Sequence, residues 1–339
     1  MHILFIGGTG LISTAITRKL LERGEKVTCF NRGKSASRLP EHPNLSVIVG
    51  DRHDRAAYES AFDGQTYDVV VDMISFQPDD AESDIRAFTG KCGHFMHCST
   101  VCVYSGPPET IPTPETEPYH SIGGYGKNKA AIEQRLLAEF EKNKFPATIL
   151  RPSHSYGEGG GILRPWGPWD GWGRFIDRLR KNKPVIVPGD GTNLWASCHV
   201  DDVAEGFIAL MGKEASFGEC YNITGENNMT WNTYHEQVAE VVGGTFHPVY
   251  IPTDILCEVA PTWSGGLKEI FAWTSIFDNS KIKALGYPGQ SISLKEGTAR
   301  TLAWMEANGR VTEESGDGGY EDRLIEAWRK SVGSLPKVE

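Results

Sequence analysis

The stretch Ile3-Leu4-Phe5-Ile6-Gly7-Gly8-Thr9-Gly10-Leu11-Ile12-Ser13 decides the fold of this chain. Its apolar first part is typical of a buried strand, and Leu11–Arg23 has the pattern of an amphipathic helix. Glycines between a strand and a helix allow a tight turn and a close approach to a pyrophosphate, which the N–H groups and positive dipole end of the helix can hold. An ordinary strand-to-helix turn is the plainer alternative. We predict that the turn binds a dinucleotide pyrophosphate through Gly7, Thr9, Gly10, Leu11 and Ile12, with Ser13 as a small residue at the third glycine position.

The first half of the chain alternates short strands with helical patterns, clearest at Gly126–Lys142. Such alternation predicts an α/β fold, a Rossmann-type doubly wound parallel sheet with helices on both faces. We predict a cofactor domain over residues 1–155, which segments near 195–225 rejoin, and a smaller C-terminal α/β substrate-binding region over residues 156–339. The predicted strands of the first half are Ile3–Ile6, Lys26–Phe30, Leu45–Val49, Asp68–Asp72, His94–Ser99 and Ala147–Leu150. The second half predicts a strand pair around Pro184–Ser197, a strand at Cys220–Ile223, and helices at Arg174–Lys181, Asp201–Met211, Trp231–Val242, Leu294–Asn308 and Tyr320–Val332.

The bulk composition is that of an ordinary globular protein, with 339 residues, 39% of them hydrophobic and 23% charged. The formal net charge of −10 disfavours nucleic acid as a partner. No apolar run approaches the ~20 residues of a membrane span. We expect no signal peptide, because the apolar run Ile3–Ile6 is short and leads directly into the glycine turn. The seven scattered cysteines fit reduced thiols, and we expect a cytoplasmic protein.

The residues after the second strand bear on the choice of cofactor. A carboxylate there would hydrogen-bond the 2′-hydroxyl of NAD and repel the 2′-phosphate of NADP. The strand instead ends in Asn31-Arg32-Gly33-Lys34, in which Arg32 can pair with a phosphate and Lys34 can add charge. Two solvated surface cations are the alternative. We predict NADP in preference to NAD, with Asp51 and Arg52 flanking the adenine.

Tyr125 and Lys129 are candidate catalytic residues. Residues four apart share one face of a helix, and an ammonium beside a phenol favours the phenolate. We therefore predict that Lys129 lowers the pKa of Tyr125 and makes it a general base, while also binding the nicotinamide ribose. The spacing alone also arises by chance. A strand that ends in the hydroxyls Ser99-Thr100 precedes the pair and supports the catalytic interpretation.

At this point the chain resembles the extended short-chain dehydrogenase/reductase superfamily, in its sugar epimerase/dehydratase group. The resemblance implies that Thr100 assists catalysis with Ser99 beside it, and that the backbone near Pro152 and Ser153 lines the nicotinamide. We further assign Met73 and Ile74 to the cofactor site and, weakly, Ser75 to the substrate. The pieces that carry the resemblance are Gly7–Ser13, Ser99–Tyr104, Tyr125–Lys129, Arg151–Gly157 and His199–Val203. The sequences Asn31–Lys34, Gly50–Arg52 and the Trp-rich Gly157–Phe175 look like an atypical branch that includes chloroplast stem-loop-binding proteins.

Three departures from the family pattern narrow the chemistry. Dehydratases of the group carry an acid two residues after the threonine, where this chain has Cys102, so dehydration is disfavoured. Trp195 stands where nucleotide-sugar epimerases place a diphosphate-binding arginine, and His154 replaces a substrate-side asparagine. These two replacements weaken the case for a nucleotide diphosphate substrate, although another arginine could bind the diphosphate: Arg164, Arg174 or Arg178.

Two other patterns have competing interpretations. The run His94–Cys102 looks like a metal cluster, but alternate strand residues point to opposite faces, so we expect buried cysteines and no metal. Trp166, Trp169 and Trp172 either stack on a sugar ring or anchor a loop, and we assign Trp166 and Trp169 weakly to the substrate, together with His154 and Trp195. His199 is expected to be structural.

These observations predict an NAD(P)-dependent epimerase of a sugar-like small molecule, acting through a transient ketone. The alternative is an NADP(H)-dependent sugar or carbonyl reductase or dehydrogenase with the same catalytic residues. A non-enzymatic RNA-binding or redox-sensing protein, as in part of the atypical branch, is disfavoured by the net charge of −10. The resemblance suggests a homodimer, and we expect neither nucleic acid nor a membrane as a partner.

Overall fold

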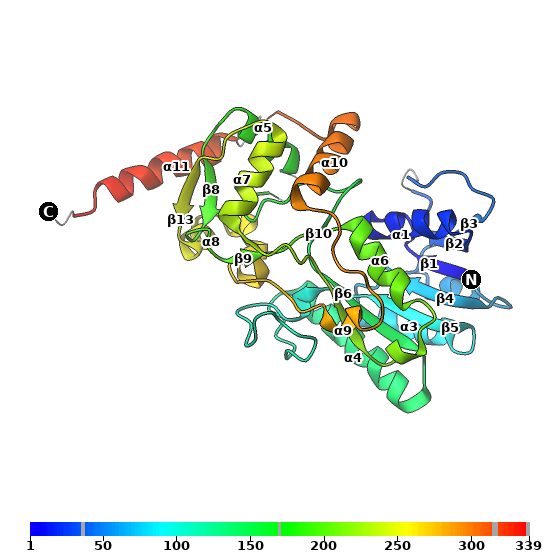
Figure 1. The fold of residues 1–339 in the computed structure, drawn as a ribbon. Coiled ribbons are helices and arrows are strands. Elements are labelled where there is room, and N and C mark those ends of the chain that lie inside the picture. Colours follow the sequence, from blue (N-terminus) through cyan, green and yellow to red (C-terminus); the bar gives the residue numbers. More distant parts are fainter. Residues whose placement is uncertain (35–37, 169–170, 314–317, 337–339) are drawn as a thin grey trace. The chain divides into compact units, whose positions relative to one another are not determined.

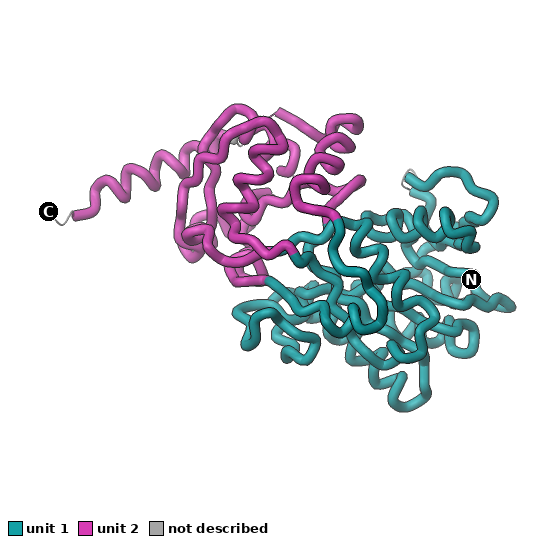
Figure 2. Tube along the Cα trace, viewed as in Figure 1, with its two compact units in different colours: residues 1–155, 196–226, 276–291 teal, residues 156–195, 227–275, 292–339 magenta. Residues whose placement is uncertain are grey.

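The protein was analysed as a computed structural model that describes residues 1–34, 38–168, 171–313 and 318–336 (Figure 1). The chain forms two compact units (Figure 2). Unit 1 comprises residues 1–155, 196–226 and 276–291, and unit 2 comprises residues 156–195, 227–275 and 292–339. The return of 276–291 to the first unit had no counterpart in the sequence prediction.

Unit 1 is built on a seven-stranded parallel sheet with the order β11-β6-β5-β4-β1-β2-β3. The chain builds outward from β1 to one edge and then returns to build β4 and later strands on the other side. This reversal between β1 and β4 creates the crevice, at the carboxyl ends of the strands, where ligands of such sheets bind. The predicted doubly wound Rossmann-type fold is confirmed. The strands are β1 (His2–Ile6), β2 (Lys26–Asn31), β3 (Leu45–Val49), β4 (Tyr67–Asp72), β5 (Cys92–Cys98), β6 (Ala147–Pro152) and β11 (Cys220–Ile223).

Helices cover both faces of this sheet because alternate strand residues point to opposite sides. In β1, Ile3 and Phe5 pack into one apolar cluster with α1 (Leu11–Glu22) and α6 (Val200–Leu210). Leu4 and Ile6 pack into the other cluster. That second cluster contains residues of α3 (Pro78–Phe88) and α4 (Gly124–Asn143), and Figure 1 shows these helices. All four β1 side chains are completely buried, and each stabilises the fold by about 1.5–3 kcal/mol.

The remaining short elements of unit 1 connect the strands and helices described above. They are α2 (Arg55–Ser60), η1 (Val101–Val103), β10 (Cys198–His199), η2 (Glu214–Ser216) and α9 (Ser280–Lys283), while β7 (Ser155–Tyr156) crosses the boundary between the units in sequence. The predicted helices Leu11–Arg23 and Gly126–Lys142 correspond to α1 and α4, which differ from the predictions by one or two residues at their ends.

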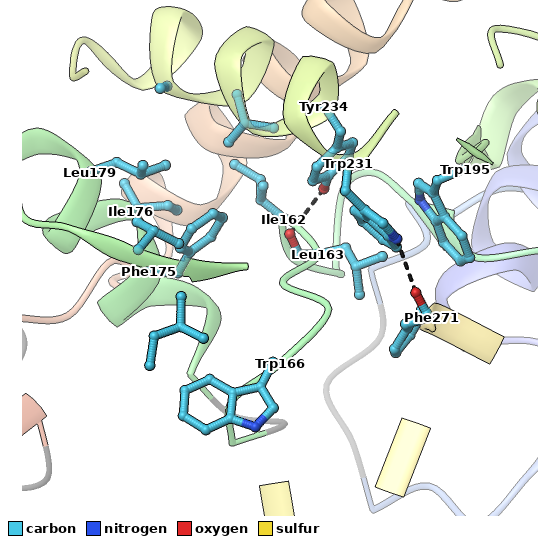
Figure 3. Close-up of a cluster of buried hydrophobic side chains, with 14 of the residues drawn as sticks. Ile162, Leu163, Trp166, Phe175, Ile176, Leu179, Trp195, Trp231, Tyr234 and Phe271 are labelled. Carbon is cyan, nitrogen blue, oxygen red and sulfur yellow. Dashed lines mark hydrogen bonds between the residues drawn. The ribbon is translucent and has the colours of Figure 1, made fainter. Parts of the chain in front are cut away.

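Unit 2 has its own apolar core, shown in Figure 3. Trp195 and Trp231 stack with ring centroids 4.7 Å apart, and the Trp231 indole donates to the carbonyl oxygen of Phe271 at 3.0 Å. Tyr234 donates to the carbonyl oxygen of Leu163 at 3.0 Å. The elements are α5 (Trp172–Arg180), β8 (Val185–Pro188), β9 (Leu194–Trp195), β12 (Met229–Thr230), α7 (Trp231–Val242), β13 (Pro248–Ile251), α8 (Thr253–Val259), η3 (Pro261–Trp263), η4 (Leu267–Phe271), α10 (Leu294–Ala307) and α11 (Gly318–Gly333).

The predicted strand pair around Pro184–Ser197 is wrong in its pairing. The strand β8 pairs in parallel with β13, and β9 pairs antiparallel with β12, so neither strand pairs with the other. Sequence neighbours suggested a hairpin, but the partners follow helix α7 or precede it. In the described part of the chain, no helix combines the length and apolar character needed to cross a membrane.

Candidate functional site

The glycine turn between β1 and α1 is closed by the hydroxyl of Ser13. This hydroxyl donates to the carbonyl oxygen of Gly7 at 2.9 Å and accepts from the backbone N–H of Gly10 at 2.8 Å. Gly7 has a φ of +87°, a backbone conformation that favours glycine. The N–H groups of Leu11 and Ile12 then stand in the first turn of α1, where no preceding helical carbonyl can accept them. Serine at the third fingerprint position therefore organises the turn in addition to being small.

Two glycines of the turn serve different purposes. A Cβ atom on Gly8 would lie 2.3 Å from the sulfur of Cys29, so Gly8 is required for packing the turn on β2. A Cβ atom on Gly10 would meet only the Ser13 hydroxyl, at 3.2 Å, and a Gly7 carbonyl, at 3.9 Å. Apart from the Ser13 hydroxyl, the space beside Gly10 is unfilled, which leaves room for a ligand against the backbone.

A pocket of about 460 Å³ lies on the β2 and β3 side of the turn. Its lining includes predicted cofactor residues from three loops, namely Gly7, Thr9, Gly10, Asn31, Arg32, Lys34, Asp51 and Arg52. Arg32 and Lys34 are both exposed. The backbone N–H of His53 and the nearby charges of His53, Arg32 and Lys34 lower the pKa of Asp51. The pocket thus carries two exposed cations at the end of β2, and one acid at the end of β3.

The guanidinium of Arg52 is engaged by buried carboxylates although the residue lines this pocket, and its place beside an adenine stays a prediction. The side chain is 3% exposed and pairs with Asp72 at 2.7 Å and Asp84 at 3.1 Å. Burial raises the pKa of Asp72, but the Arg52 charge outweighs it and holds that pKa well below its ordinary value. The acids that hold Arg52 lie on β4 and α3, and their proximity was not visible in the Gly50-Asp51-Arg52 sequence.

A second pocket of about 290 Å³ lies at the carboxyl ends of β4, β5 and β6. It shares Gly7, Gly10, Ile74 and Phe76 with the first pocket, so the two form one continuous groove. All the predicted catalytic residues and most of the remaining predicted cofactor residues line it, namely Leu11, Ile12, Met73, Ile74, Ser99, Thr100, Tyr125, Lys129, Pro152 and Ser153. The structure thereby brings together residues that lie up to about 140 positions apart in the chain.

Tyr125 and Thr100 are hydrogen-bonded to each other through their side chains. Although 46% of Tyr125 is exposed, its hydroxyl end is largely buried, and burial raises its pKa. The thiols of Cys98 and Cys102 raise that pKa further, whereas the hydrogen bond of Thr100 lowers it. The net pKa of Tyr125 is therefore raised and not lowered as predicted, and Lys129 is not among the largest influences on it.

Lys129 is buried and directed at the backbone of β5. Its side chain donates to the carbonyl oxygen of Cys98 at 2.7 Å, and the residue is 1% exposed. Burial lowers the pKa of its ammonium, against the charges of Cys98, Asp72 and Glu133, which raise it. An ammonium has three N–H donors, so Lys129 keeps donors for a further acceptor in the groove.

Ser99 is held by a buried ion pair beneath the groove. Its hydroxyl donates to the carboxylate of Glu133, which lies one turn after Lys129 on α4 and is completely buried. The guanidinium of Arg151 reaches that carboxylate through Nε at 3.1 Å, and Tyr119 donates to it at 2.9 Å. The Ser99 proton is therefore engaged, which leaves the oxygen as an acceptor toward the groove. Glu133 was not predicted from the sequence. Its spacing of four residues from Lys129 places both side chains on one face of the helix and could have indicated it.

A close approach of α4 to the end of β5 fixes the distance between these groups. A Cβ atom on Gly126 would lie 2.3 Å from the carbonyl oxygen of Cys102 in η1. Only glycine permits this contact, because any side chain would push α4 away from η1. Gly126 thereby holds Tyr125 beside Thr100.

The predicted substrate residues lie mostly away from the groove. Trp166 and Trp195 are each 1% exposed in the core of unit 2, so neither can offer an indole face to a sugar, which corrects that expectation. The Ser75 hydroxyl is completely buried and does not line either pocket. His154 contacts the hydroxyl of Ser197 at 3.1 Å, and burial lowers its pKa to about 4. Trp169 lies outside the described residues.

The arginines considered as substitutes for the missing diphosphate ligand have structural partners. Arg178 is completely buried and pairs with Asp322 at 2.7 Å, and Arg164 pairs with Glu321 at 2.5 Å. Both contacts attach α11 to unit 2. Arg174 also has an interaction partner.

The run His94–Cys102 is a buried strand as far as Cys98 in β5, whereas Cys102 lies in η1 and is half-buried. One ring nitrogen of His94 lies 2.8 Å from the hydroxyl of Thr148, and the other accepts from the backbone of Gly212 at 3.1 Å. Burial raises the pKa of Cys98 to about 11. Among residues 1–34, 38–168, 171–313 and 318–336, no group of three or more metal-ligating side chains is gathered.

The groove fits a dinucleotide by three observations. Open space lies against Gly10, the first turn of α1 presents backbone N–H groups, and the buried Ser153 hydroxyl in the second pocket has no partner in the structure. The pyrophosphate of a dinucleotide would fill the space beside Gly10 and accept hydrogen bonds from the N–H groups of α1. Its nicotinamide end would supply a partner for the Ser153 hydroxyl.

Comparison with known proteins identifies relatives over most of the chain. Residues 3–224 match the NAD dependent epimerase/dehydratase family. The chain is 27% identical over 252 residues to the chloroplast stem-loop binding protein of 41 kDa b of Arabidopsis thaliana, a match that covers 71% of this chain and 63% of the plant protein. It is 24% identical over 314 residues to 2′-dehydrokanamycin reductase of Streptomyces kanamyceticus, covering 92% and 86% of the two chains.

Solved structures share the fold. The UDP-glucose 4-epimerase of Thermotoga maritima, solved with UDP-glucose, has a TM-score of 0.70 at 25% identity and covers 91% of this chain and 99% of its own. The dTDP-glucose 4,6-dehydratase of Bacillus anthracis, solved with NAD, has a TM-score of 0.71 at 20% identity and covers 91% and 97% of the two chains.

Proposed function

The chain belongs to the NAD-dependent epimerase/dehydratase family, and from this premise we propose that it is an NAD(P)-dependent epimerase of a sugar or sugar derivative. One observation carries the proposal. Tyr125, Thr100 and Lys129 line a pocket that is continuous with the glycine turn, so acid–base groups stand beside the nicotinamide end of a dinucleotide groove.

The roles of the side chains follow from their hydrogen bonds. Bound nicotinamide supplies the hydride acceptor and donor for the substrate carbon. Tyr125 exchanges the proton of the substrate hydroxyl, and its raised pKa keeps the phenol protonated, so it carries the proton that a ketone takes up on reduction. Thr100 donates to the Tyr125 oxygen and stabilises the phenolate that forms when an alcohol is oxidised. Lys129 would use its remaining N–H donors to hold the nicotinamide ribose.

Ser99 would accept a hydrogen bond from the substrate. Because Glu133 engages the Ser99 proton, the free lone pairs of this oxygen suit a hydroxyl or amine donor. This role fits a polyhydroxylated substrate, which carries a second hydroxyl next to the reacting one.

Several residues bear on the reaction, cofactor and ligand that this chain has within the family. The chain has Cys102 where dehydration needs a carboxylic acid, and burial raises the pKa of the nearby Cys98, so the Cys98 thiol does not replace that acid. Arg32 and Lys34 favour NADP over NAD. The net charge of −10 disfavours RNA as a ligand, despite the plant stem-loop-binding relative. Homodimer formation and a cytoplasmic location stay predictions.

A reductase is the second candidate, because 2′-dehydrokanamycin reductase is similar over 92% of the chain. An epimerase retains its cofactor between turnovers, whereas a reductase consumes reduced cofactor. The first measurement is the cofactor released on denaturing the purified protein, read by absorbance, followed by NADPH consumption with a panel of keto sugars. Retained cofactor with isomerisation but no net consumption supports the epimerase. Stoichiometric consumption without isomerisation would reject it in favour of the reductase.

The variant Tyr125→Phe tests the site itself. It removes the proton donor without changing the ring, so turnover should fall by about 10²–10⁴-fold while the Kd for cofactor stays within about twofold. Thr100→Val is the matched variant for the hydrogen bond to Tyr125. Full turnover in Tyr125→Phe would refute the proposed mechanism for any substrate.

A further inference from the structure

Phe76 occupies a position that ordinary core packing does not explain. It follows β4, lines both pockets of the groove, and is 46% exposed although its ring is apolar. A large apolar side chain gains little by lying half in water. Phe76 therefore presents an exposed aromatic ring where the lining of the two pockets is shared.

The backbone of Phe76 is fixed from two sides. Its N–H donates to the carboxylate of Asp80 in the first turn of α3, at 2.8 Å. Its carbonyl oxygen accepts from the side chain of Asn128 on α4, at 3.0 Å. Asp80 is itself 1% exposed and pairs with Arg55. Both neighbouring helices therefore hold the backbone of Phe76 at the groove.

The ring of Phe76 lies against the catalytic helix. Its centroid is 4.9 Å from the ammonium of Lys129 and 6.4 Å from the centroid of the Tyr125 ring. An aromatic face attracts a cation at this distance. Phe76 is exposed while Lys129 is buried, so the ring forms a cover of the ammonium on the groove side.

We propose that Phe76 is a positioning residue that acts through Lys129, keeping water from its ammonium and aiming its free donors along the groove. The inference rests on the proposed function only in that the acceptor of those donors is the nicotinamide ribose. The covering of the lysine by the ring is a property of the chain itself.

The surroundings of Lys129 give the expected direction of change. The charged or titratable groups facing it are Asp72 on β4, His97 and Cys98 on β5, Glu133 on α4 and, farther along, Arg52. None of these belongs to the loop that carries Phe76. Burial is the largest influence on the Lys129 pKa and lowers it. Removing the ring ends its attraction for the ammonium but admits water. Because burial is the largest influence, we expect the pKa to rise toward its ordinary value.

The test is the pH dependence of Lys129 acetylation by sulfosuccinimidyl acetate, followed by mass spectrometry on the protein without added cofactor. The plateau at high pH measures access to the amine, and the midpoint measures its pKa. In Phe76→Ala we expect the plateau to rise and the midpoint to move up by about one pH unit. Phe76→Tyr, which keeps a ring, should restore the wild-type curve.

The matched control is Phe140→Ala, because Phe140 of α4 also lies under a lysine, which directly follows that helix. The Lys144 ammonium is 5.1 Å from the Phe140 centroid, but Lys144 is exposed. This variant should leave the Lys129 curve unchanged. If Phe76→Ala does not fold, Phe76→Leu replaces it, with the same expectation. An unchanged plateau and midpoint in the folded variant would overturn the proposal and leave Phe76 as a groove wall alone.

Turnover gives the second measurement. With NADPH and an active substrate, Phe76→Ala should lower kcat and move the pH profile in the direction of the labelling midpoint, while Phe140→Ala does neither. A changed labelling curve with no turnover for any tested substrate would count against the proposed function and leave the cover of Lys129 standing. Turnover with a wild-type pH profile in Phe76→Ala would count against the cover.

Discussion

Gly10→Ala should weaken cofactor binding without unfolding the protein. Gly10 has φ −74° and ψ −178°, which alanine adopts without strain, and its added Cβ would meet only the Ser13 hydroxyl and a Gly7 carbonyl. Loss of chain freedom in the unfolded state stabilises the variant by about 0.4–1 kcal/mol, and the poorer helix cap offsets this by a similar amount. We expect the free energy of unfolding to change by less than about 1 kcal/mol.

The effect on binding comes from the space that the new methyl group takes. A pyrophosphate on this turn would accept hydrogen bonds from the N–H groups of Leu11 and Ile12. Hydrogen bonds to charged groups contribute about 1.5–3 kcal/mol each. Displacing the phosphate enough to lose one of them raises the Kd by about tenfold to 150-fold.

Gly8→Ala is the matched control, because its Cβ points into the protein. It would lie 2.3 Å from the Cys29 sulfur and 2.9 Å from the Cys29 Cβ, so β2 must shift. Overpacking of this kind costs about 1–3 kcal/mol of stability. Gly8→Ala should therefore lower the urea midpoint far more than Gly10→Ala does.

The assay combines urea unfolding with titration of NADP and NAD, followed by tryptophan fluorescence. The two variants should have separate effects: Gly10→Ala binds cofactor weakly with normal stability, and Gly8→Ala has low stability. Wild-type affinity in Gly10→Ala would show that the pyrophosphate does not rest on this turn. A loss of more than about 3 kcal/mol of stability in that variant would contradict the open space against Gly10.

Other predictions concern charge and stability. Arg32→Ala should raise the Kd for NADP by about tenfold and leave that for NAD within about twofold; equal effects on both would reject the NADP assignment. Glu133→Leu should lower the free energy of unfolding by about 3–5 kcal/mol, because it leaves the buried Arg151 unpaired, and calorimetry measures this; wild-type stability would deny the buried ion pair. Burial lowers the pKa of His94 to about 3 and of His235 to about 4, so each stays neutral in the folded state while the unfolded state binds protons below its ordinary pKa of 6.5. Each should therefore remove up to about 1.4 kcal/mol of stability per pH unit as the pH falls below 6.5, and His94→Gln should flatten the urea-derived profile; an unflattened profile would count against a buried, neutral His94.

The fold was predictable because its signals are local. A strand, a glycine turn and a helix follow one another within Ile3–Glu22, and the alternation continues through β6. The groove was also largely predictable, since the carboxyl ends of parallel strands meet at one edge of the sheet. Tyr125 and Lys129 therefore reach the same pocket as Gly7, as their motifs indicated.

The errors have a common physical cause, which is that long-range partners decide what a side chain can do. Arg52 was predicted to flank the adenine, and the sequence did not show that Asp72 and Asp84 pair with its guanidinium. Trp195 was read as a substrate contact, but Trp231 stacks on it in the core. A single sequence contains the type of a residue but not the residue that it meets.

Phe76 had no sequence signal at all. It is one apolar residue after Ser75, and nothing in its neighbours marks it as different from a core phenylalanine. Its place in the groove depends on Asp80 and Asn128, which belong to two different helices. Only their arrangement in space shows that the ring is directed at Lys129.

Unit 1 is made from three separate stretches of the chain, and this affects how it can fold during synthesis on the ribosome. β6 forms the outer side of the sheet until β11 pairs with it, and β11 comes from residues 220–223, after a long stretch of unit 2 has been made. A nascent chain that ends before β11 therefore exposes an unpaired strand edge, the kind of surface that pairs with other chains. In a fragment that ends at residue 155, the edge of β6 would stay unpaired permanently. Anyone who wishes to express the dinucleotide-binding half alone should rejoin residues 196–226 and 276–291 to it.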